Sequence, residues 1–254
     1  MNGNKEITDL LNELKFFGMK ESLERRMTQA RKTSMDFEEF FSLVLEDEKL
    51  YRINRKSEML RKRGKFNERV YLDEYRDTGN RGISKSMIKN FKSLYFVDTL
   101  ENIIFIGSTG TGKSFLAQAI GHEACACGVE VFFISVNRLF KEIELADKQG
   151  TYLSYLNRLK NRVKVLILDD FGLRNYSHGE ANALYDILED RCQKGSVIVT
   201  SQLDPRGWKV LIEDKVIADA IFDRITATAD IIHVKGSSFR KNKKRKRGLK
   251  TGKK

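Results

Sequence analysis

The sequence has 254 residues, 41% of them hydrophobic and 32% charged, which is typical of a soluble folded protein and excludes a disordered or fibrous chain. No apolar run approaches the ~20 residues that a membrane span requires, and the polar N-terminus lacks the apolar stretch of a secretory signal. We therefore expect a cytoplasmic protein that does not contact membranes. The three cysteines are too few for a disulfide framework, and we expect Cys125 and Cys127 to be small core residues rather than metal ligands.

The net charge of +12 is concentrated in two segments. Residues 240–254 contain ten Lys or Arg and no acid, so the rest of the chain is nearly neutral, and we expect this tail to be disordered. A second basic cluster lies at 49–69 and is typical of a surface that binds phosphate backbones, although a solvated helix face remains an alternative. The candidate DNA contacts in it are Arg52, Arg55, Lys56, Arg61, Lys62, Arg63 and Lys65.

The pattern from residue 5 to residue 63 predicts helices. An apolar stripe at helical spacing is interrupted at Gly18, which we expect to separate a first helix from a second. Asp36, with Glu39 three residues later, resembles a capping box that opens a long amphipathic helix, and Gly64 is expected to follow its end. We predict an N-terminal helical domain over 1–70 that binds DNA or a partner.

Residues 66–83 are predicted to be an irregular linker, and Ser84 is predicted to cap the next helix. From Asn102 onward, short apolar runs alternate with amphipathic helices. This alternation predicts an α/β fold, a three-layer parallel sheet buried on both faces, over 71–239. The runs are 103–106, 131–134, 165–168, 196–200 and 231–234.

Residues 107–114 match the phosphate-binding pattern G-x-x-x-x-G-K-[ST]. Its glycines let the backbone turn tightly and direct N–H groups at phosphate oxygens, and the following helix presents its positive end to the same anion. Lys113 is expected to neutralise the β- and γ-phosphates of ATP, and the Ser114 hydroxyl is expected to bind Mg²⁺. The predicted ATP-binding residues are Gly107, Ser108, Thr109, Gly110, Thr111, Gly112, Lys113, Ser114 and Phe115.

Two further apolar runs end in polar side chains. The run 165–168 is followed by Asp169, predicted to hold the Mg²⁺ shell, and by Asp170, predicted to orient or deprotonate the attacking water. Asp170 as the cap of the following turn is the alternative. After the run 196–200, any of Thr200, Ser201 and Gln202 is a candidate to face the γ-phosphate, and a polar turn is the alternative.

Arg224 and Arg240 are candidates to stabilise charge on a transferring phosphoryl group, although spacing alone favours surface salt bridges for both. The chain as a whole resembles the IstB family, the ATP-binding helper proteins of IS21-type insertion sequences. This family is related to the helicase loader DnaC and to DnaA, within the AAA+ class. The resemblance extends from about Leu10 to Lys241. It rests on the phosphate-binding loop, on 166–172, on 198–203, and most specifically on 217–225 and 235–241.

The resemblance implies that Arg224 is an arginine finger that reaches the ATP of a neighbouring subunit, and that Arg240 is a sensor arginine within its own subunit. It also implies an ATP-dependent oligomer on duplex DNA that regulates a partner transposase and its target selection. Two alternatives remain open, a DnaC-like replicative helicase loader and a nucleotide-dependent switch with negligible turnover. Many related P-loop enzymes have Glu where this chain has the shorter Asp170, and this departure keeps the second alternative open.

Overall fold

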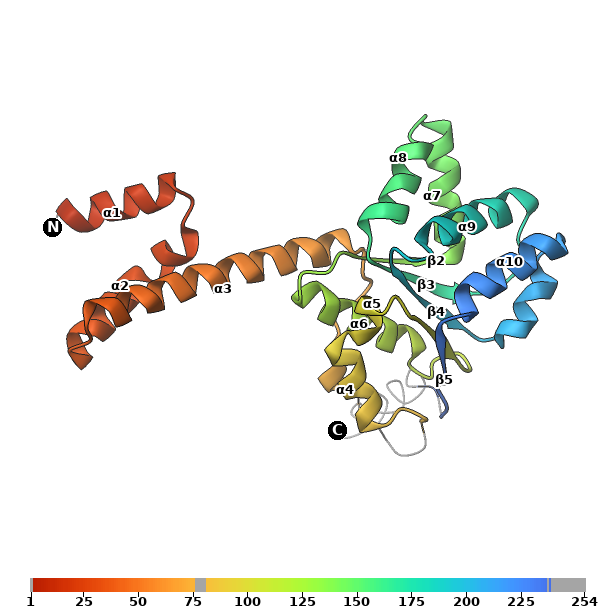
Figure 1. Cartoon of the computed structure of the whole chain (residues 1–254), viewed down its shortest axis with the longest axis horizontal. Coiled ribbons are helices and arrows are strands. Elements are labelled where there is room, and N and C mark those ends of the chain that lie inside the picture. Colours follow the sequence, from red (N-terminus) through yellow and green to blue (C-terminus); the bar gives the residue numbers. More distant parts are fainter. Residues whose placement is uncertain (1, 76–80, 237, 239–254) are drawn as a thin grey trace, which may run out of the picture. The chain divides into compact units, whose positions relative to one another are not determined.

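The computed structural model describes residues 2–75, 81–236 and 238 (Figure 1). The chain falls into two compact units that divide between Met59 and Leu60. We call them the helical unit, up to Met59, and the α/β unit, from Leu60. Within the described ranges, no helix is both long and apolar enough to cross a membrane.

The helical unit is built from α1 (Asn2–Glu13), α2 (Phe17–Thr33) and most of α3 (Phe37–Arg63). The Asp36 carboxylate accepts a hydrogen bond from the N–H of Glu39 at 2.8 Å, which confirms the predicted start of α3. Gly64 follows the last helical residue, as predicted, and its N–H donates to the carbonyl of Leu60 at 2.8 Å.

The prediction that Gly18 separates two helices is wrong, because the break lies at residues 14–16 and Gly18 belongs to α2. A Cβ at Gly18 would lie 2.5 Å from the Cβ of Tyr51 and 2.8 Å from the carbonyl oxygen of Asp47. The Glu48 carboxylate accepts hydrogen bonds from the N–H groups of Gly18 (2.7 Å) and Met19 (3.1 Å). Gly18 is therefore a close-packing residue, and it lets α3 cap the start of α2.

The α/β unit contains a five-stranded parallel sheet in the order β2-β3-β4-β1-β5. Each of the five predicted apolar runs forms one of these strands. They are β1 (Asn102–Ile106), β2 (Val131–Ser135), β3 (Val165–Phe171), β4 (Ser196–Ser201) and β5 (Ala229–His233).

Helices cover both faces of the sheet, so the predicted three-layer α/β fold is confirmed (Figure 1). One face carries α4 (Lys85–Ser93), α5 (Tyr95–Asp98) and α6 (Lys113–Ala126). The other carries α7 (Val136–Lys148), α8 (Tyr152–Asn157), α9 (His178–Arg191) and α10 (Lys215–Thr226). Shorter helical turns lie at Leu72–Glu74, Arg158–Arg162 and Pro205–Leu211.

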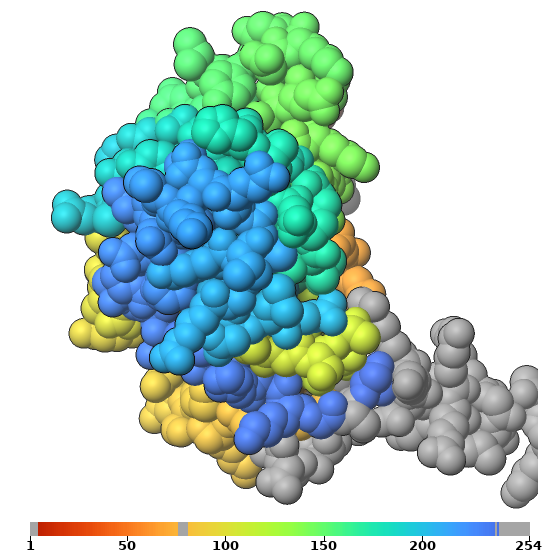
Figure 2. Space-filling model, turned by 90° about the vertical axis from the view of Figure 1, so that its right-hand side faces the viewer, coloured from red at the N-terminus to blue at the C-terminus, as the bar shows by residue number. Residues whose placement is uncertain are grey.

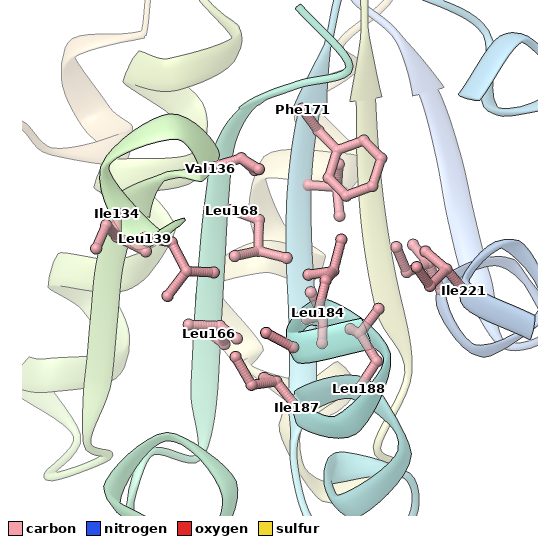
Figure 3. Packing of buried hydrophobic residues seen from close by; sticks show 14 of the residues in the cluster. Ile134, Val136, Leu139, Leu166, Leu168, Phe171, Leu184, Ile187, Leu188 and Ile221 are labelled. Carbon is pink, nitrogen blue, oxygen red and sulfur yellow. The ribbon is translucent and has the colours of Figure 1, made fainter. Parts of the chain in front are cut away.

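Successive side chains of each central strand enter opposite hydrophobic layers. In β3, Leu166 and Leu168 pack in the layer of α7, α9 and α10, whereas Val165 and Ile167 pack in the layer of α6. Figure 3 shows the first of these layers, where Leu166 and Leu168 face Leu184 and its neighbours on α9. Because both faces are buried, each strand is a continuous apolar run rather than an alternating one.

In the described part of the segment predicted to be a linker, residues 66–75 and 81–83, the chain is irregular apart from the turn Leu72–Glu74, and its apolar side chains are buried at three positions. Val70, Leu72 and Ile83 are 6%, 1% and 3% exposed and belong to the layer of α6. The Ser84 hydroxyl accepts a hydrogen bond from the N–H of Met87 at 3.1 Å, which confirms Ser84 as the cap of α4. We call residues 64–75 the connector, because they join α3 to the rest of the α/β unit.

Candidate functional site

The phosphate-binding motif has the strand–loop–helix context that the sequence predicts. The loop 107–112 follows β1, and α6 begins at Lys113. The N–H groups of the first helical turn have no partner within the helix and carry the positive end of its dipole. The carboxyl ends of the other parallel strands lie at the same edge of the sheet, which is where α/β proteins bind their ligands.

Two glycines of the loop are required by the close approach of the chain that follows β5. Gly110 has φ 78°, and a Cβ there would lie 2.2 Å from the hydroxyl oxygen of Ser238. A Cβ at Gly107 would lie 2.2 Å from the carbonyl oxygen of Val234. Val234 and Ser238 therefore lie directly against the loop, which the sequence alone did not indicate.

The Lys113 ammonium lies within the curve of the loop. It donates hydrogen bonds to the carbonyl oxygens of Gly107 at 2.7 Å and Ser108 at 2.9 Å, and the residue is only 6% exposed. The Thr111 hydroxyl donates to the same Ser108 carbonyl at 2.9 Å. These contacts hold the cation where an anion cradled by the loop would meet it.

A cavity of about 690 Å³ opens beside the loop. Six of the predicted ATP-binding residues line it, together with both predicted acids of β3. The lining residues predicted from the sequence are Thr109, Gly110, Gly112, Lys113, Ser114, Phe115, Asp169, Asp170 and Gln202. The three other loop residues, Gly107, Ser108 and Thr111, contribute the backbone and side-chain contacts described above.

Thr200 joins the two acids at the end of β3. Its hydroxyl donates to the Asp169 carboxylate at 2.6 Å and accepts from the N–H of Asp170 at 3.1 Å. Thr200 is fully buried and Asp169 is 7% exposed, so this contact is shielded from water. β4 lies between β1 and β3 in the sheet, and Thr200 therefore reaches Asp169 from the strand that adjoins the phosphate-binding strand.

The backbone at Asp170 has an unusual conformation. Its φ is 56°, in the left-handed region, and the pairing of β3 with β4 shifts register between Leu168 and Phe171. Such a bulge redirects a side chain at the end of a strand, and here Asp170 lines the cavity. The helix that follows, α9, has its own capping box, which is formed by Ser177 and Glu180.

The three candidates at the end of β4 are placed differently. The Ser201 hydroxyl donates to the carbonyl of Phe171 at 2.8 Å and accepts from the indole N–H of Trp208 at 3.0 Å. Ser201 therefore fixes the loop after β3 in the core, whereas Thr200 contacts the acids and Gln202 lines the cavity.

The oxygen ligands on this edge fit a magnesium ion held largely by phosphate and water. Ser114 and Asp169 line the same cavity, and Asp169 Oδ2 makes no hydrogen bond within the described residues. No group of three or more His, Cys, Asp or Glu side chains in these ranges is arranged to hold a metal. One hydroxyl and one or two carboxylates are the set that Mg²⁺ uses beside nucleotide phosphates.

The connector forms a wall of the cavity that the sequence did not predict. The Gln118 side-chain oxygen on α6 accepts from the N–H groups of Asn67 (2.8 Å) and Glu68 (3.2 Å). His122, one turn later, contacts the carbonyl oxygen of Glu68 through Nε2 at 2.9 Å. Asn67, Glu68, Glu74 and Tyr75 line the same cavity as the acids. In the sequence, the only sign of this contact is that Gln118 and His122 lie one helical turn apart within an apolar helix.

The sequence resembles known proteins over nearly its whole length. The family description "IstB-like ATP binding protein" matches residues 9–247. The chain belongs to this family. An insertion sequence ATP-binding protein of Sinorhizobium fredii is 32% identical over 238 residues, which are 94% of this chain and 97% of that protein. An IS21 ATP-binding protein of Pseudomonas aeruginosa is 31% identical over 246 residues, covering 97% and 92%.

Solved structures confirm the AAA+ P-loop fold of this IstB-like protein. DnaI matches with a TM-score of 0.54 and 25% identity, over 67% of this chain and 90% of its own. AMPPCP-bound DnaA from Aquifex aeolicus matches with a TM-score of 0.56 and 22% identity, over 74% and 56%. Family membership supports ATP as the ligand of the IstB-like protein.

Arg224 lies at the opposite edge of the sheet from the cavity. The Asn102 side chain, at the start of β1, donates to the carbonyl oxygens of Arg224 (3.1 Å) and Ile225 (3.0 Å). The phosphate-binding loop follows the other end of β1, about 13 Å away at the usual rise per residue. Arg240 and the basic tail 240–254 lie outside the described residues.

The predicted DNA-contacting residues of the IstB-like protein differ in their exposure and in the ion pairs that they form. All but Lys65 lie on α3, where Arg52, Arg55, Lys56, Lys62 and Arg63 are exposed and Arg61 is half-buried. Arg52 pairs with Glu48 at 2.7 Å. Lys65 pairs with Glu142 at 3.0 Å and lies 5.3 Å from the centre of the Phe132 ring, so its contacts are within the α/β unit.

Proposed function

We propose that this IstB-like protein hydrolyses ATP at sites shared between neighbouring subunits assembled on duplex DNA, and that it thereby regulates a partner transposase and its choice of target. The proposal keeps the functional division predicted from the sequence. Residues 1–70 serve DNA or partner binding, 71–239 form the ATPase, and 240–254 add basic charge. The cytoplasm, where transposase and DNA meet, is the proposed location.

The separation of Arg224 from the cavity of its own chain is the observation that carries the shared-site proposal. The backbone of Arg224 lies beside the amino end of β1, whereas Lys113 and Asp169 lie at the carboxyl ends of the strands. An arginine that stabilises a transferring phosphoryl group must touch it. Arg224 therefore serves the ATP of a second subunit, and hydrolysis depends on assembly.

Within one subunit, the residues at the carboxyl edge divide the work of hydrolysis. Lys113 and the loop N–H groups bind and orient the triphosphate. Mg²⁺, held by Ser114 and Asp169, neutralises charge on the phosphate oxygens when bound. Asp170 orients the attacking water and accepts its proton, and Thr200 fixes the acid pair through Asp169 Oδ1 and the Asp170 N–H.

DNA binding is supported by the exposed basic residues of α3 and by the charge of the tail. These are contacts to the phosphate backbone, which carry no sequence information by themselves. We therefore propose binding to duplex DNA without strong sequence preference, with partner transposase contacts supplying the biological site.

A DnaC-like helicase loader is the second candidate, because the structure of DnaI matches at 25% identity. The relatives that match along nearly the full chain are insertion sequence ATP-binding proteins, and this favours the transposition role. Co-purification of a replicative helicase instead of the cognate transposase would favour the loader.

Mixing two inactive variants tests the shared site. Lys113→Ala retains Arg224 but lacks the phosphate-binding cation, and Arg224→Ala retains the cavity but lacks the arginine. We expect each to be impaired alone and an equal mixture to recover hydrolysis on duplex DNA, at interfaces where an intact cavity meets an intact arginine. The control is a mixture of Arg224→Ala with the variant that carries both Lys113→Ala and Arg224→Ala, and it should stay inactive. Recovery equal to that control would contradict a shared site.

A further inference from the structure

The side chain of Arg224 lies in a defined setting between two helices. α10 packs against α9, and both contribute to the outer face of the α/β unit (Figure 2). The Arg224 side chain is 27% exposed, so most of it is covered while part remains accessible from solvent. Its surroundings can therefore control how the guanidinium is presented at this surface.

Three contacts surround the guanidinium. Its Nε donates to the carboxylate of Glu189, and its Nη1 donates to the carbonyl oxygen of Ala220 at 3.3 Å. Its Cζ lies 5.0 Å from the centre of the Tyr185 ring. The remaining nitrogen, Nη2, makes no hydrogen bond within the described residues.

Tyr185 and Glu189 form this setting from one helix. They lie four residues apart on α9 and therefore face the same side. Tyr185 packs against the hydrophobic layer below it, which fixes the ring. The hydrogen bond with Arg224 lowers the pKa of Glu189, and the same bond raises the pKa of Arg224, so both groups are charged at neutral pH.

We propose that Tyr185 and Glu189 are positioning residues that hold the Arg224 guanidinium in the orientation in which it meets the triphosphate on a neighbouring subunit. The inference rests on the proposed shared site. A free arginine side chain samples many rotamers, and ordering it at the moment of reaction would oppose catalysis. Two anchored nitrogens and a stacked face remove that freedom beforehand, while Nη2 is left to bind phosphate oxygen.

An ion pair that restrained the arginine from reaching a neighbouring subunit would have the opposite effect on turnover. The two roles predict opposite changes when Glu189 is removed. A positioning pair gives a lower turnover, and a restraining pair gives a higher one.

A double-mutant cycle in the full-length protein distinguishes these roles. We expect Glu189→Ala to lower kcat for DNA-stimulated hydrolysis about tenfold, and Arg224→Ala to lower it at least a hundredfold. Glu189→Gln, which keeps an oxygen acceptor, should fall in between wild type and Glu189→Ala. The variant that carries both Glu189→Ala and Arg224→Ala should have the same kcat as Arg224→Ala alone, because Glu189 acts only through that arginine.

Asp190→Asn is the matched control. Asp190 lies next in α9 and pairs with Lys160 at 2.5 Å, so the variant removes a comparable ion pair without touching Arg224. It should leave kcat unchanged, and Kd for a fluorescent ATP analogue should be unchanged in all variants.

Unchanged or raised kcat in Glu189→Ala, with Arg224→Ala impaired, would overturn the inference and leave the shared site standing. A double variant clearly worse than Arg224→Ala would also overturn it, since Glu189 would then act by another route. Full activity in Arg224→Ala would remove the proposed shared site itself.

Discussion

At the scale of single residues, Thr200 connects Asp169, the proposed Mg²⁺ ligand, with Asp170, the residue proposed to orient the attacking water. Its hydroxyl contacts the Asp169 carboxylate and the Asp170 N–H at once. The left-handed φ of Asp170 is unfavourable for a non-glycine residue and persists only where its surroundings fix it. Thr200 is part of what fixes it.

Thr200→Val keeps the shape of the side chain and removes the hydroxyl. We expect kcat for ATP hydrolysis to fall by about 10- to 100-fold, because the acids lose their alignment, with little change in ATP affinity. Steady-state kinetics and titration with an ATP analogue measure the two effects. Thr226→Val is the control, because within the described residues the hydroxyl that it removes bonds only to the Phe222 carbonyl. Equal losses in both variants would contradict a specific role for Thr200.

Arg191 stabilises the α/β unit from within. The residue is 1% exposed and donates four hydrogen bonds to the carbonyl oxygens of Leu159, Val163, Lys164 and Ser196. Burial lowers the pKa of Arg191 to about 10, so it stays charged at neutral pH. One side chain thereby ties the turn before β3 to the starts of β3 and β4.

We expect Arg191→Met to lower the free energy of unfolding by about 3 kcal/mol, because buried carbonyls lose their donors. Urea unfolding followed by the fluorescence of Trp208, the single tryptophan, measures this. Arg162→Met, at an exposed position, should change stability by less than about 0.5 kcal/mol. Similar values for the two variants would show that the four hydrogen bonds contribute little.

At the scale of elements, α3 and α2 are joined by charges. Arg26 donates two hydrogen bonds to the Asp47 carboxylate, at 2.7 and 2.8 Å, and this bond lowers the pKa of Asp47 from 3.8 to about 2. The pKa of Glu48 is also lowered, by Arg52 and by the N–H groups of α2 against the opposing effect of burial. Both groups are therefore more acidic in the folded helical unit than in the unfolded chain.

This shift predicts acid sensitivity of the helical unit. A carboxyl with a depressed folded pKa stabilises above its unfolded pKa, and that contribution disappears as pH falls through the folded value. We expect protection of α2 amides from hydrogen exchange to decrease between about pH 4 and about pH 2. Asp47→Asn should weaken this pH dependence, whereas Glu38→Gln, at an exposed position, should not. The same pH dependence in Asp47→Asn would contradict the assignment.

Elements that depend on local pattern could be predicted from the sequence, and those that depend on tertiary contact could not. The five strands and the phosphate-binding loop are encoded by continuous apolar runs and by residues within eight positions of one another. Gly18 looked like a helix breaker because its role depends on Tyr51 and Asp47, far along the chain. The wall formed by the connector depends in the same way on Gln118, 51 residues from Asn67.

The same distinction applies to the candidate site. The acids of β3 follow directly from an apolar run. The different placements of Thr200, Ser201 and Gln202 depend on the hydrogen bonds of the two hydroxyls and on which side chain lines the cavity. The setting of Arg224 joins residues 35 apart on two helices, and no spacing rule signals it.

At the scale of the whole molecule, charge distribution predicts how DNA is bound. Basic residues cluster on α3 and in the tail, whereas the chain outside the tail is nearly neutral as a whole. Each cation that neutralises a phosphate releases counterions, so affinity should fall steeply with salt.

We expect Arg55→Ala and Lys56→Ala each to weaken duplex binding alike on unrelated sequences. Each should also reduce the slope of log affinity against log salt by about 1. Fluorescence anisotropy over a range of salt concentrations measures this. Lys148→Ala, on the exposed surface of α7, is the control and should change neither quantity. An affinity that is flat with salt would contradict a phosphate-contact mode.

The central claim is that ATP hydrolysis is completed by assembly on DNA, and steady-state ATP hydrolysis with and without duplex DNA tests it most directly. The full-length protein is compared with Lys113→Ala and Arg224→Ala. We predict stimulation by duplex that is lost in both variants. Robust hydrolysis that neither DNA nor Arg224→Ala alters would leave the phosphate-binding loop standing and would contradict the shared, DNA-dependent site.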